Sequence, residues 1–243
     1  MELMLRTAFF TALLFIGLSA CRTAGNTGGA MTVNKVVVGQ LGVNCYVVSD
    51  GKSRDAIVID PGDEPERIIE VIDKAGLKPS VIVFTHAHYD HVCAARELRD
   101  RYKATIMMHA DDNVTYQRSR DTCISWGFQP DDFPGDFQTF SNGDTITAGS
   151  VALTAIHTPG HTPGSCCLLG GRTLFTGDTL FKGSVGRTDL PGGSTGQLIS
   201  SLEKLKGLPP ETRVLCGHGD ETTIGSEIKN NPYLNGKYKL RIF

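Results

Sequence analysis

The sequence has little excess charge of either sign. Its 24 lysine and arginine residues nearly balance 26 aspartate and glutamate residues, which leaves a net charge of −2 at neutral pH. This balance argues against a broad basic surface, so we expect no nucleic acid partner. Tryptophan occurs only once, while the hydrophobic share of 40% is that of an ordinary globular protein. The length allows one large domain or two small ones.

The chain also lacks an apolar run long enough to anchor it across a bilayer. The nearly unbroken run at residues 8–18 falls short of the roughly 20 residues that a spanning helix needs, and it suits a signal peptide. The sequence Leu18-Ser19-Ala20-Cys21 follows and resembles a bacterial lipobox. This resemblance implies a diacylglyceryl thioether on Cys21, a membrane anchor, and export to the periplasm or cell exterior. The alternative is an ordinary cleaved signal peptide followed by a chance cysteine.

Composition divides the chain into three parts. Residues 1–20 form the predicted lipoprotein signal peptide, residues 21–32 are rich in Gly, Thr and Ala and predict a flexible tether, and residues 33–243 form the predicted domain. Arg22 follows the cysteine, so the aspartate that commonly marks retention in the inner membrane is absent. An outer-membrane address is therefore preferred.

The cysteines show no spacing typical of a disulfide framework. Cys166 and Cys167 are adjacent in a strand-like run, so their side chains point to opposite faces. Cys45 and Cys216 also lie in apolar runs, which favours buried free thiols that behave as small hydrophobic side chains. Export would permit disulfides, and one that involves Cys123 stays open as an alternative.

The sequence is organised around the segment 85–91, Thr-His-Ala-His-Tyr-Asp-His, which follows a short apolar run typical of a buried strand. In an extended turn His86 and His88 project to the same side and could bind one metal ion. Asp90 and His91 lie beyond the bend and could reach a second ion. Imidazole and carboxylate ligands suit zinc, and also iron or manganese. The alternative is a polar loop in which three of the seven histidines cluster by chance.

Further candidate ligands follow later predicted strands. His161 lies in a tight Gly-His-Thr-Pro-Gly turn, and we prefer it as a ligand to His157, which is interpreted as a strand-end histidine or a neighbour of a ligand. Asp178 ends the run Leu-Phe-Thr-Gly-Asp, and its two carboxylate oxygens could bridge two ions. His218 follows the last predicted strand. His109 ends a strand too, but no metal-binding spacing includes it, so a structural or solvated role is expected.

Two residues are candidates for roles beside the ligands. Asp60 ends a predicted strand before Pro-Gly, where it either orients a ligand histidine or is simply a turn aspartate. Arg187 lies in the glycine-rich segment 182–193 and could clamp a substrate carboxylate. Its alternative is a structural ion pair with Asp189.

Alternating strand and helix patterns fill most of the domain. Helices are predicted at 65–75, from Val92 to about 102, around Leu198–Leu205 and at 222–230, between runs of β-branched residues. Residues 111–140 show the least regular pattern and contain six aromatic residues. We expect these aromatics to form a wall over the site, with a small satellite core as the alternative.

The order of these motifs resembles the metallo-β-lactamase superfamily. The motifs that carry this resemblance are H-x-H-x-D-H, then H-T-P-G-H-T-P-G-S, then T-G-D and G-H. The resemblance covers about residues 34–230. The resemblance implies an α/β fold in the form of a four-layer αββα sandwich, with two mixed sheets face to face and helices outside. It also implies a metal-dependent hydrolase with a small-molecule substrate.

The resemblance further implies two divalent metal ions, with zinc expected. A hydroxide between the ions would be the nucleophile, because bound zinc lowers the pKa of water to about 7. Asp90 would bind one ion and orient that hydroxide, and Asp178 would bridge both ions. The other implied ligands are His86, His88 and His161 for one ion, and His91 and His218, with Asp90, for the second.

Within the superfamily the sequence is most similar to hydroxyacylglutathione hydrolases of the glyoxalase II type. The segments 176–181 and 210–218 carry this similarity, and Arg187 falls near the position of a basic residue that contacts glutathione. The chain ends soon after His218, so it resembles short members that lack the C-terminal helical domain. The implied activity is thioester hydrolysis, with an anionic thioester as substrate.

Three alternatives remain. An exported metallo-β-lactamase fits the predicted location, but β-lactamases of this fold generally have cysteine or serine where Asp178 stands. A persulfide dioxygenase shares H-x-H-x-D-H and a Gly-Arg-Thr-Asp sequence but uses one iron, whereas Gly217-His218-Gly219 favours a complete second metal site. A non-catalytic metal-binding lipoprotein would not require the whole ligand set.

Overall fold

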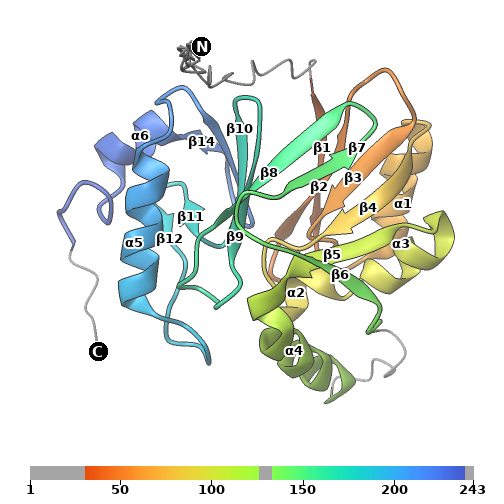
Figure 1. The fold of residues 1–243 in the computed structure, drawn as a ribbon, viewed down its shortest axis with the longest axis horizontal. Coiled ribbons are helices and arrows are strands. Elements are labelled where there is room, and N and C mark those ends of the chain that lie inside the picture. Colours follow the sequence, from red (N-terminus) through yellow and green to blue (C-terminus); the bar gives the residue numbers. More distant parts are fainter. Residues whose placement is uncertain (1–30, 126–132, 239–243) are drawn as a thin grey trace, which may run out of the picture.

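The computed structural model describes residues 31–125 and 133–238, and these residues form two six-stranded sheets packed face to face with helices on the outside (Figure 1). The N-terminal sheet has the order β1-β2-β3-β4-β5-β6 and the C-terminal sheet the order β14-β13-β10-β9-β8-β7. Helices α1 and α3 cover the first sheet, and α5 and α6 cover the second (Figure 1). The expected four-layer αββα sandwich is therefore confirmed.

The element bounds follow the chain in order. The N-terminal sheet and its helices are β1 Thr32–Val38, β2 Val43–Ser49, β3 Asp55–Ile59, α1 Pro65–Lys74, β4 Lys78–Val83, α2 Tyr89–Val92, α3 Ala95–Tyr102, β5 Thr105–His109, the 3₁₀ turn η1 Ala110–Asp112, α4 Asn113–Ser125 and β6 Phe137–Phe140. The C-terminal part contains β7 Thr145–Ala148, β8 Val151–His157, β9 Cys166–Gly170, β10 Thr173–Gly177, β11 Leu180–Phe181, β12 Ser184–Val185, α5 Thr195–Lys206, β13 Arg213–Cys216, β14 Thr222–Thr223 and α6 Ile224–Asn230.

Strands of the N-terminal sheet are apolar on both faces because each face has its own core. In β4, Val81 and Val83 point between the sheets, whereas Ile82 points to the outer helices. Phe175 and Leu215 complete the inter-sheet core from the second sheet. Strands buried on both faces read as continuous hydrophobic runs, which explains why the sequence pattern located them.

Helix α5 seals the outer face of the C-terminal sheet. Ser194 caps it by accepting a hydrogen bond from the backbone N–H of Gln197. Leu198, Leu202 and Leu205 form its buried stripe, and burial of each contributes about 1.5–3 kcal/mol relative to exposure. The predicted leucine stripe is therefore the face that holds this helix on the sheet.

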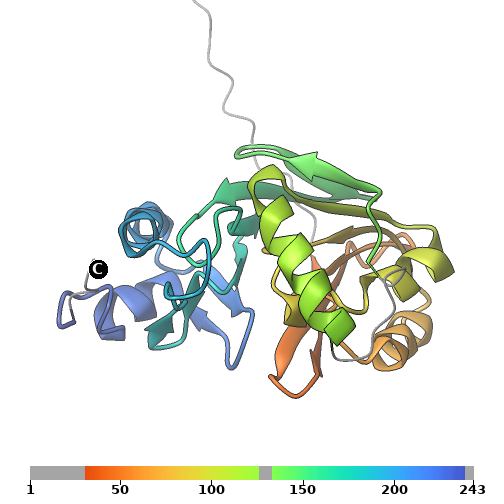
Figure 2. The ribbon, with the colours of Figure 1, turned by 90° about the horizontal axis from the view of Figure 1, so that it is seen from below.

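The segment at residues 111–140 is more regular than expected. It contains helix α4 and strand β6, and α4 lies on the near side of the molecule when seen from below (Figure 2). The pattern hid this helix because its buried positions include Thr115 and Ser119, which break the apolar periodicity that identifies a helix. At the other end, residues 222–223 form strand β14 instead of the first residues of the predicted closing helix.

The described aromatic residues of this segment belong to the two main cores, so for them neither the expected wall over the site nor a separate satellite core is found. Tyr116, Phe133 and Phe137 join the core next to the outer helices, and Phe140 joins the core between the sheets. Tyr116 stacks on Phe84 with ring centroids 6.3 Å apart, and it also contacts Phe133 and Phe137. Trp126 and Phe128 lie outside the described residues, as do the predicted signal peptide and nearly all of the tether. The first described strand, β1, begins at Thr32, one residue before the predicted start of the domain. None of the described helices has the length and apolar character needed to cross a membrane.

The carboxyl ends of the parallel strands in both sheets meet at one edge of the sandwich, and this edge positions the candidate site. Strand β4 runs parallel to β3 and β5 and ends just before the histidine motif, and β10 runs parallel to β13 in the other sheet. Asp178 follows β10 and His218 follows β13. A bridge between Val43 and His218, with a hydrogen bond from Asn44 N–H to the carbonyl oxygen of Gly217, joins the sheets there. Ligands commonly bind at the carboxyl ends of strands in such sheets.

Candidate metal centre

Asp112 fixes the turn that carries the histidine motif. Its fully buried carboxylate accepts hydrogen bonds from the backbone N–H of Ala87 at 2.7 Å, from the Thr162 hydroxyl at 2.9 Å and from the backbone N–H of Gly164 at 2.8 Å. Ser119 of α4 donates to the carbonyl oxygen of Ala87. One carboxylate therefore ties the motif turn to the His161 turn. Sequence reasoning missed Asp112, because it precedes a helix that the pattern did not reveal.

The first group of predicted ligands, His86, His88 and His161, is called the three-histidine half-site. Their rings lie 4.6–4.9 Å apart between centroids, and their nitrogens are close enough to hold one metal ion. His161 Nδ1 lies 2.8 Å from the carbonyl oxygen of Arg187. An Nδ1–H that donates to this oxygen leaves His161 Nε2 with a free lone pair, 2.9 Å from His88 Nδ1.

The second group, Asp90, His91 and His218, is called the mixed half-site. The Oδ2 atom of Asp90 lies 3.7 Å from His91 Nε2 and 3.4 Å from His218 Nε2, and the three residues could hold another ion. His218 Nδ1 lies 3.0 Å from the carbonyl oxygen of Leu41, which fixes its ring from the β1–β2 loop. Short helix α2 brings Asp90 and His91 to this position directly after His88.

Asp178 lies between the half-sites. Its Oδ1 atom is 3.5 Å from His91 Nε2, and its Oδ2 atom is 3.6 Å from His161 Nε2 and 3.5 Å from His218 Nε2. Gly217 permits this approach, because a Cβ atom there would lie 2.3 Å from Asp178 Oδ1. All seven predicted ligands are therefore brought together, with the one carboxylate that faces both groups in the centre.

The electrostatics of the two half-sites differ. Burial, and next the neighbouring His161, lower the pKa of His88 to about 3, and burial also holds the pKa of His86 well below its ordinary value. Burial alone would lower the pKa of His91, but the carboxylates of Asp178, Asp90 and Asp60 outweigh it and raise that pKa to about 10. Burial thus favours neutral imidazoles at His86 and His88, whereas the carboxylates around His91 favour a positive charge on its ring.

Buried atoms without partners test whether metal ions fit this centre. His86 Nε2, His91 Nε2 and Asp178 Oδ1 are buried and have no hydrogen-bond partner in the part of the chain that the structure describes. A buried polar atom left in this state costs about 1–3 kcal/mol, so such atoms normally have a partner. All three face the centre, and all are ligand types for zinc, iron or manganese. The residues present therefore fit metal ions.

Asp60 lies behind His91 and contacts it directly. Its Oδ2 atom is 3.1 Å from His91 Nδ1, and its carboxylate also accepts hydrogen bonds from the backbone N–H and the hydroxyl of Thr85. The residue is fully buried and has φ +51°, a left-handed conformation that non-glycine residues seldom adopt. Its carboxylate orients the ring of His91, the geometry in which a carboxylate supports a ligand histidine.

A cavity of about 960 Å³ opens at the centre and is called the larger cavity. His88, Asp90, His161, Asp178 and His218 face it. Its other walls come from four places: the β1–β2 loop, helix α2, helix α4 and the segment from β11 to residue 191. They contribute Leu41, Tyr89, Thr115, Arg118, Ser119, Asp121, Thr122, Phe181, Val185, Arg187, Leu190 and Pro191. The space combines an apolar side with a few polar groups, as small-molecule sites do.

Two arginines line the larger cavity, and they differ in whether a carboxylate pairs with them. Arg187 donates from Nε and Nη2 to the carboxylate of Asp189, each at 2.7 Å, so the structure contains the ion pair that was its alternative role. Arg118 of α4 is exposed, and no carboxylate pairs with it among residues 31–125 and 133–238. Sequence reasoning did not single out Arg118, because nothing in its local spacing distinguishes it from its neighbour Arg120.

A second histidine cluster lies apart from this centre. His109 and His157 stack with ring centroids 4.1 Å apart, next to Asp111. One nitrogen of each ring is engaged, since His157 Nε2 lies 2.8 Å from the carbonyl oxygen of Pro163 and His109 Nδ1 accepts the backbone N–H of Asp111. This arrangement agrees with the structural interpretation of both residues.

A comparison with protein families decides what this architecture is. The model described as the metallo-beta-lactamase superfamily matches residues 38–218. The chain belongs to the metallo-β-lactamase superfamily. All seven predicted ligands lie within the matched residues. Superfamily membership also agrees with the αββα sandwich described above.

Named relatives share nearly the whole folded part. Hydroxyacylglutathione hydrolase GloC of Haemophilus influenzae is 34% identical over 212 residues, which cover 85% of this chain and 100% of the relative. A crystal structure of TTHA1623 in a di-iron-bound form is similar with a TM-score of 0.76 and 38% identity, and the match covers 83% of this chain and 100% of that one. The crystal structure of the BLEG-1 B3 metallo-beta-lactamase also gives a TM-score of 0.76, with 33% identity, 84% coverage of this chain and 100% of that one.

Proposed function

We propose that this chain is a dinuclear metal-dependent hydrolase of anionic thioesters, of the hydroxyacylglutathione type. The observation that carries the proposal is the position of Asp178, which faces both half-sites at 3.5–3.6 Å. A carboxylate in this position is suited to bridge two ions. The similarity to the Haemophilus influenzae hydroxyacylglutathione hydrolase supports the choice of substrate class.

The ligand set of the proposed centre contains nitrogen and oxygen donors and no sulfur. His86, His88 and His161 would hold one ion, and the mixed half-site the other. Bound ions would supply Lewis acidity and an activated water at neutral pH. Zinc is the proposed metal, and the di-iron form of a related protein supports iron as the alternative.

The protein's own residues would orient the substrate in the larger cavity. Leu41, Phe181 and Val185 offer apolar contacts near the metal centre. Arg118 and Arg187 place positive charge on the rim and would attract a carboxylate of the thiol or acyl group. The cavity combines apolar walls with these arginines, which suits a small anionic thioester, while the carboxylates of Asp90 and Asp178 face the metal centre.

Hydrolysis of β-lactams is the second candidate function. The similarity to the BLEG-1 enzyme at 33% identity favours it, and so would the proposed export of the chain. Asp178 argues against it for the reason given from the sequence. A mononuclear iron dioxygenase is disfavoured because the mixed half-site is complete, with three ligand atoms within 4.8 Å of one another.

We also propose that the chain is exported and carries a lipid anchor on Cys21. The support is the apolar run followed by Leu18-Ser19-Ala20-Cys21. Globomycin treatment of expressing cells, with the mass of the mature N-terminus as readout, tests the anchor. Accumulation of the uncleaved chain would support it, whereas unchanged processing would contradict it.

The activity itself is tested on the chain without residues 1–20. Hydrolysis of S-lactoylglutathione is measured beside that of a chromogenic cephalosporin, and metal content is determined on the same sample. Thioester turnover with about two metal ions per chain is the expected result. Cephalosporin turnover without thioester turnover would overturn the thioester proposal and favour the second candidate. Turnover of neither substrate by the fully metallated protein would overturn both.

A further inference from the structure

Two cysteines lie in contact beside the metal centre. Cys93 follows helix α2, and Cys123 lies on helix α4, and their Sγ atoms are 2.8 Å apart. This separation is shorter than the sum of two sulfur van der Waals radii. The residues stand 30 positions apart in the sequence, so only the packing of α4 against α2 brings them together.

The remaining cysteines of the described chain have different surroundings. The thiols of Cys166, Cys167 and Cys216 point to carbonyl oxygens, of Thr85, Thr176 and Asp220 respectively, and Cys45 is buried in the core next to the outer helices. The contact between Cys93 and Cys123 is therefore a specific feature of these two helices and does not reflect a general crowding of thiols in the core.

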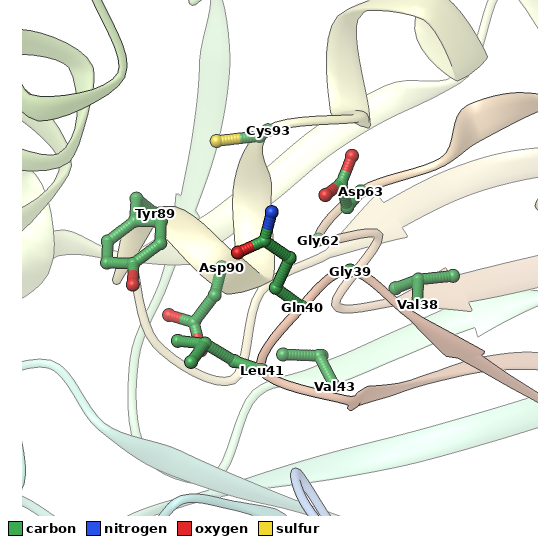
Figure 3. Close-up of a pocket in the computed structure, with 10 residues that line it drawn as sticks. All are labelled: Val38, Gly39, Gln40, Leu41, Val43, Gly62, Asp63, Tyr89, Asp90 and Cys93. Atoms are coloured by element: carbon green, nitrogen blue, oxygen red, sulfur yellow. The ribbon is translucent and has the colours of Figure 1, made fainter. Parts of the chain in front are cut away.

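One of the two thiols can be reached from outside. Cys93 is partly exposed and lines a smaller cavity of about 390 Å³, together with Gln40, Asp63 and Tyr89. Figure 3 shows its sulfur directed to the side of this cavity on which Tyr89 lies. Cys123 is fully buried. The pair thus has an accessible thiol and a sheltered partner, the arrangement that thiol–disulfide exchange uses.

We propose that Cys93 and Cys123 form a reversible disulfide that fixes helix α4 to the metal-binding turn. In the first step the Cys93 sulfur attacks a small-molecule disulfide such as oxidised glutathione, which forms a mixed disulfide and releases one thiol. The Cys123 sulfur then attacks the Cys93 sulfur of the mixed disulfide and releases the second thiol. The two cysteines lose two electrons and two protons, and the oxidant accepts both.

The consequence of the bond follows from how α4 is attached. This helix contributes Thr115, Arg118, Ser119, Asp121 and Thr122 to the larger cavity. Two of its four buried residues, Thr115 and Ser119, are small and polar, while Tyr116 and Cys123 pack into the core. A covalent link to α2 would restrain a wall of the cavity from the side of the metal centre. An exported chain would meet the oxidising conditions in which such a bond persists.

The test uses the full-length chain, equilibrated separately in reduced and in oxidised glutathione and then trapped with an alkylating reagent. Peptide mass spectrometry is expected to find a peptide pair linked through Cys93 and Cys123 only in the oxidised sample. Closing a loop of this length should raise Tm by about 5–10 °C. Hydrogen exchange of residues 113–125 should slow in the same sample.

Matched variants separate this pair from general oxidation. C93S and C123A should each abolish the linked peptide and the Tm difference between the two buffers, while C45A should retain both. Alkylation of both Cys93 and Cys123 in oxidised glutathione would overturn the proposal. Formation of the link without slower exchange in α4 would overturn its restraining role. These outcomes do not depend on the thioester activity, which is measured separately.

Discussion

The three-histidine and mixed half-sites use the same kind of ligand side chain in opposite electrostatic settings. Burial among other histidines lowers the pKa of His86 and His88, whereas three carboxylates raise the pKa of His91 to about 10. The side chain of His218 is 26% exposed, while that of His161 is 4% exposed. In the first half-site His86 and His88 offer lone pairs without competition from protons, and in the second a cation must displace a proton from His91. We therefore expect the two ions to bind with unequal affinity.

The largest effect is expected where the half-sites meet. Replacement of Asp178 by alanine removes the only carboxylate that faces both groups of the described ligands. Even the loss of an outer partner of a ligand costs about 10–100-fold in metal affinity or activity, so the D178A variant should lose more than that. Metal per chain and thioester turnover measure the effect, with the exposed Asp111 replaced in D111A as a control. Full metal content in D178A would show that Asp178 does not bridge.

Single histidine variants should expose the inequality of the half-sites. H218A should retain one tightly bound ion, since the three-histidine half-site is intact, and should lose the other on dialysis. H88A should leave its remaining ion at the mixed half-site, where it binds more weakly. Metal content measured during stepwise dialysis against a chelator distinguishes the two. Equal retention of the remaining metal ion in both variants would contradict the expected difference in affinity between the half-sites.

Acidity should affect mainly the mixed half-site. In the metal-free protein a His91 pKa of about 10 means that its ring is protonated at neutral pH, and a bound cation must displace that proton. Affinity at this half-site should therefore rise about tenfold per pH unit towards pH 10. The His88 pKa of about 3 and the lowered pKa of His86 leave these two rings neutral, so metal binding through them should change less with pH. Metal titrations at about pH 6, 7 and 8 in buffers of different ionisation enthalpy measure the protons released. Identical pH slopes for both ions would be the contrary result.

The sequence predicted those parts of the centre that depend on local pattern. Strand β4 is an apolar run, so the turn after it, with His86 and His88, could be placed from periodicity alone. Asp178 and His218 also follow β-rich runs, and parallel strands bring their carboxyl ends to one edge. Ligands that end buried strands are predictable, because the hydrophobic pattern that forms the strand also fixes where it stops.

Residues that act through long-range packing were not predictable in this way. Asp112 supports two turns that are distant in the sequence, and no local spacing records those contacts. Helix α4 contacts the rest of the protein through side chains such as Ser119 and Cys123, so it has no apolar stripe to reveal it. The sequence left Asp60 and Arg187 each between two roles, because only the folded contacts distinguish a turn aspartate from a partner of His91 or a free arginine from a paired one.

The smallest expected effect concerns substrate charge and separates the two arginines of the larger cavity. Arg187 already donates to Asp189, whereas Arg118 has no carboxylate partner among the described residues. R118Q should therefore raise KM for an anionic thioester several-fold, as an exposed ion pair of about 0.2–1 kcal/mol would allow, and R187Q should raise it less. R120Q, on the same helix but outside the cavity lining, is the matched control. KM values for anionic and neutral thioesters give the measurement.

Metal content makes this last experiment informative about the half-sites as well. The carbonyl oxygen of Arg187 lies next to His161 Nδ1, and R187Q retains that carbonyl. Burial chiefly lowers the pKa of His88, and the charge of the Arg187 guanidinium lowers it further, so removal of that charge should not weaken metal binding there. The ion of the three-histidine half-site should therefore stay bound even if KM changes. Loss of metal in R187Q would mean that the ion pair with Asp189 positions the carbonyl oxygen, so that the three-histidine half-site depends on an exposed salt bridge. That result would contradict the expected difference in metal affinity between the two half-sites, because metal binding at both would then depend on carboxylates.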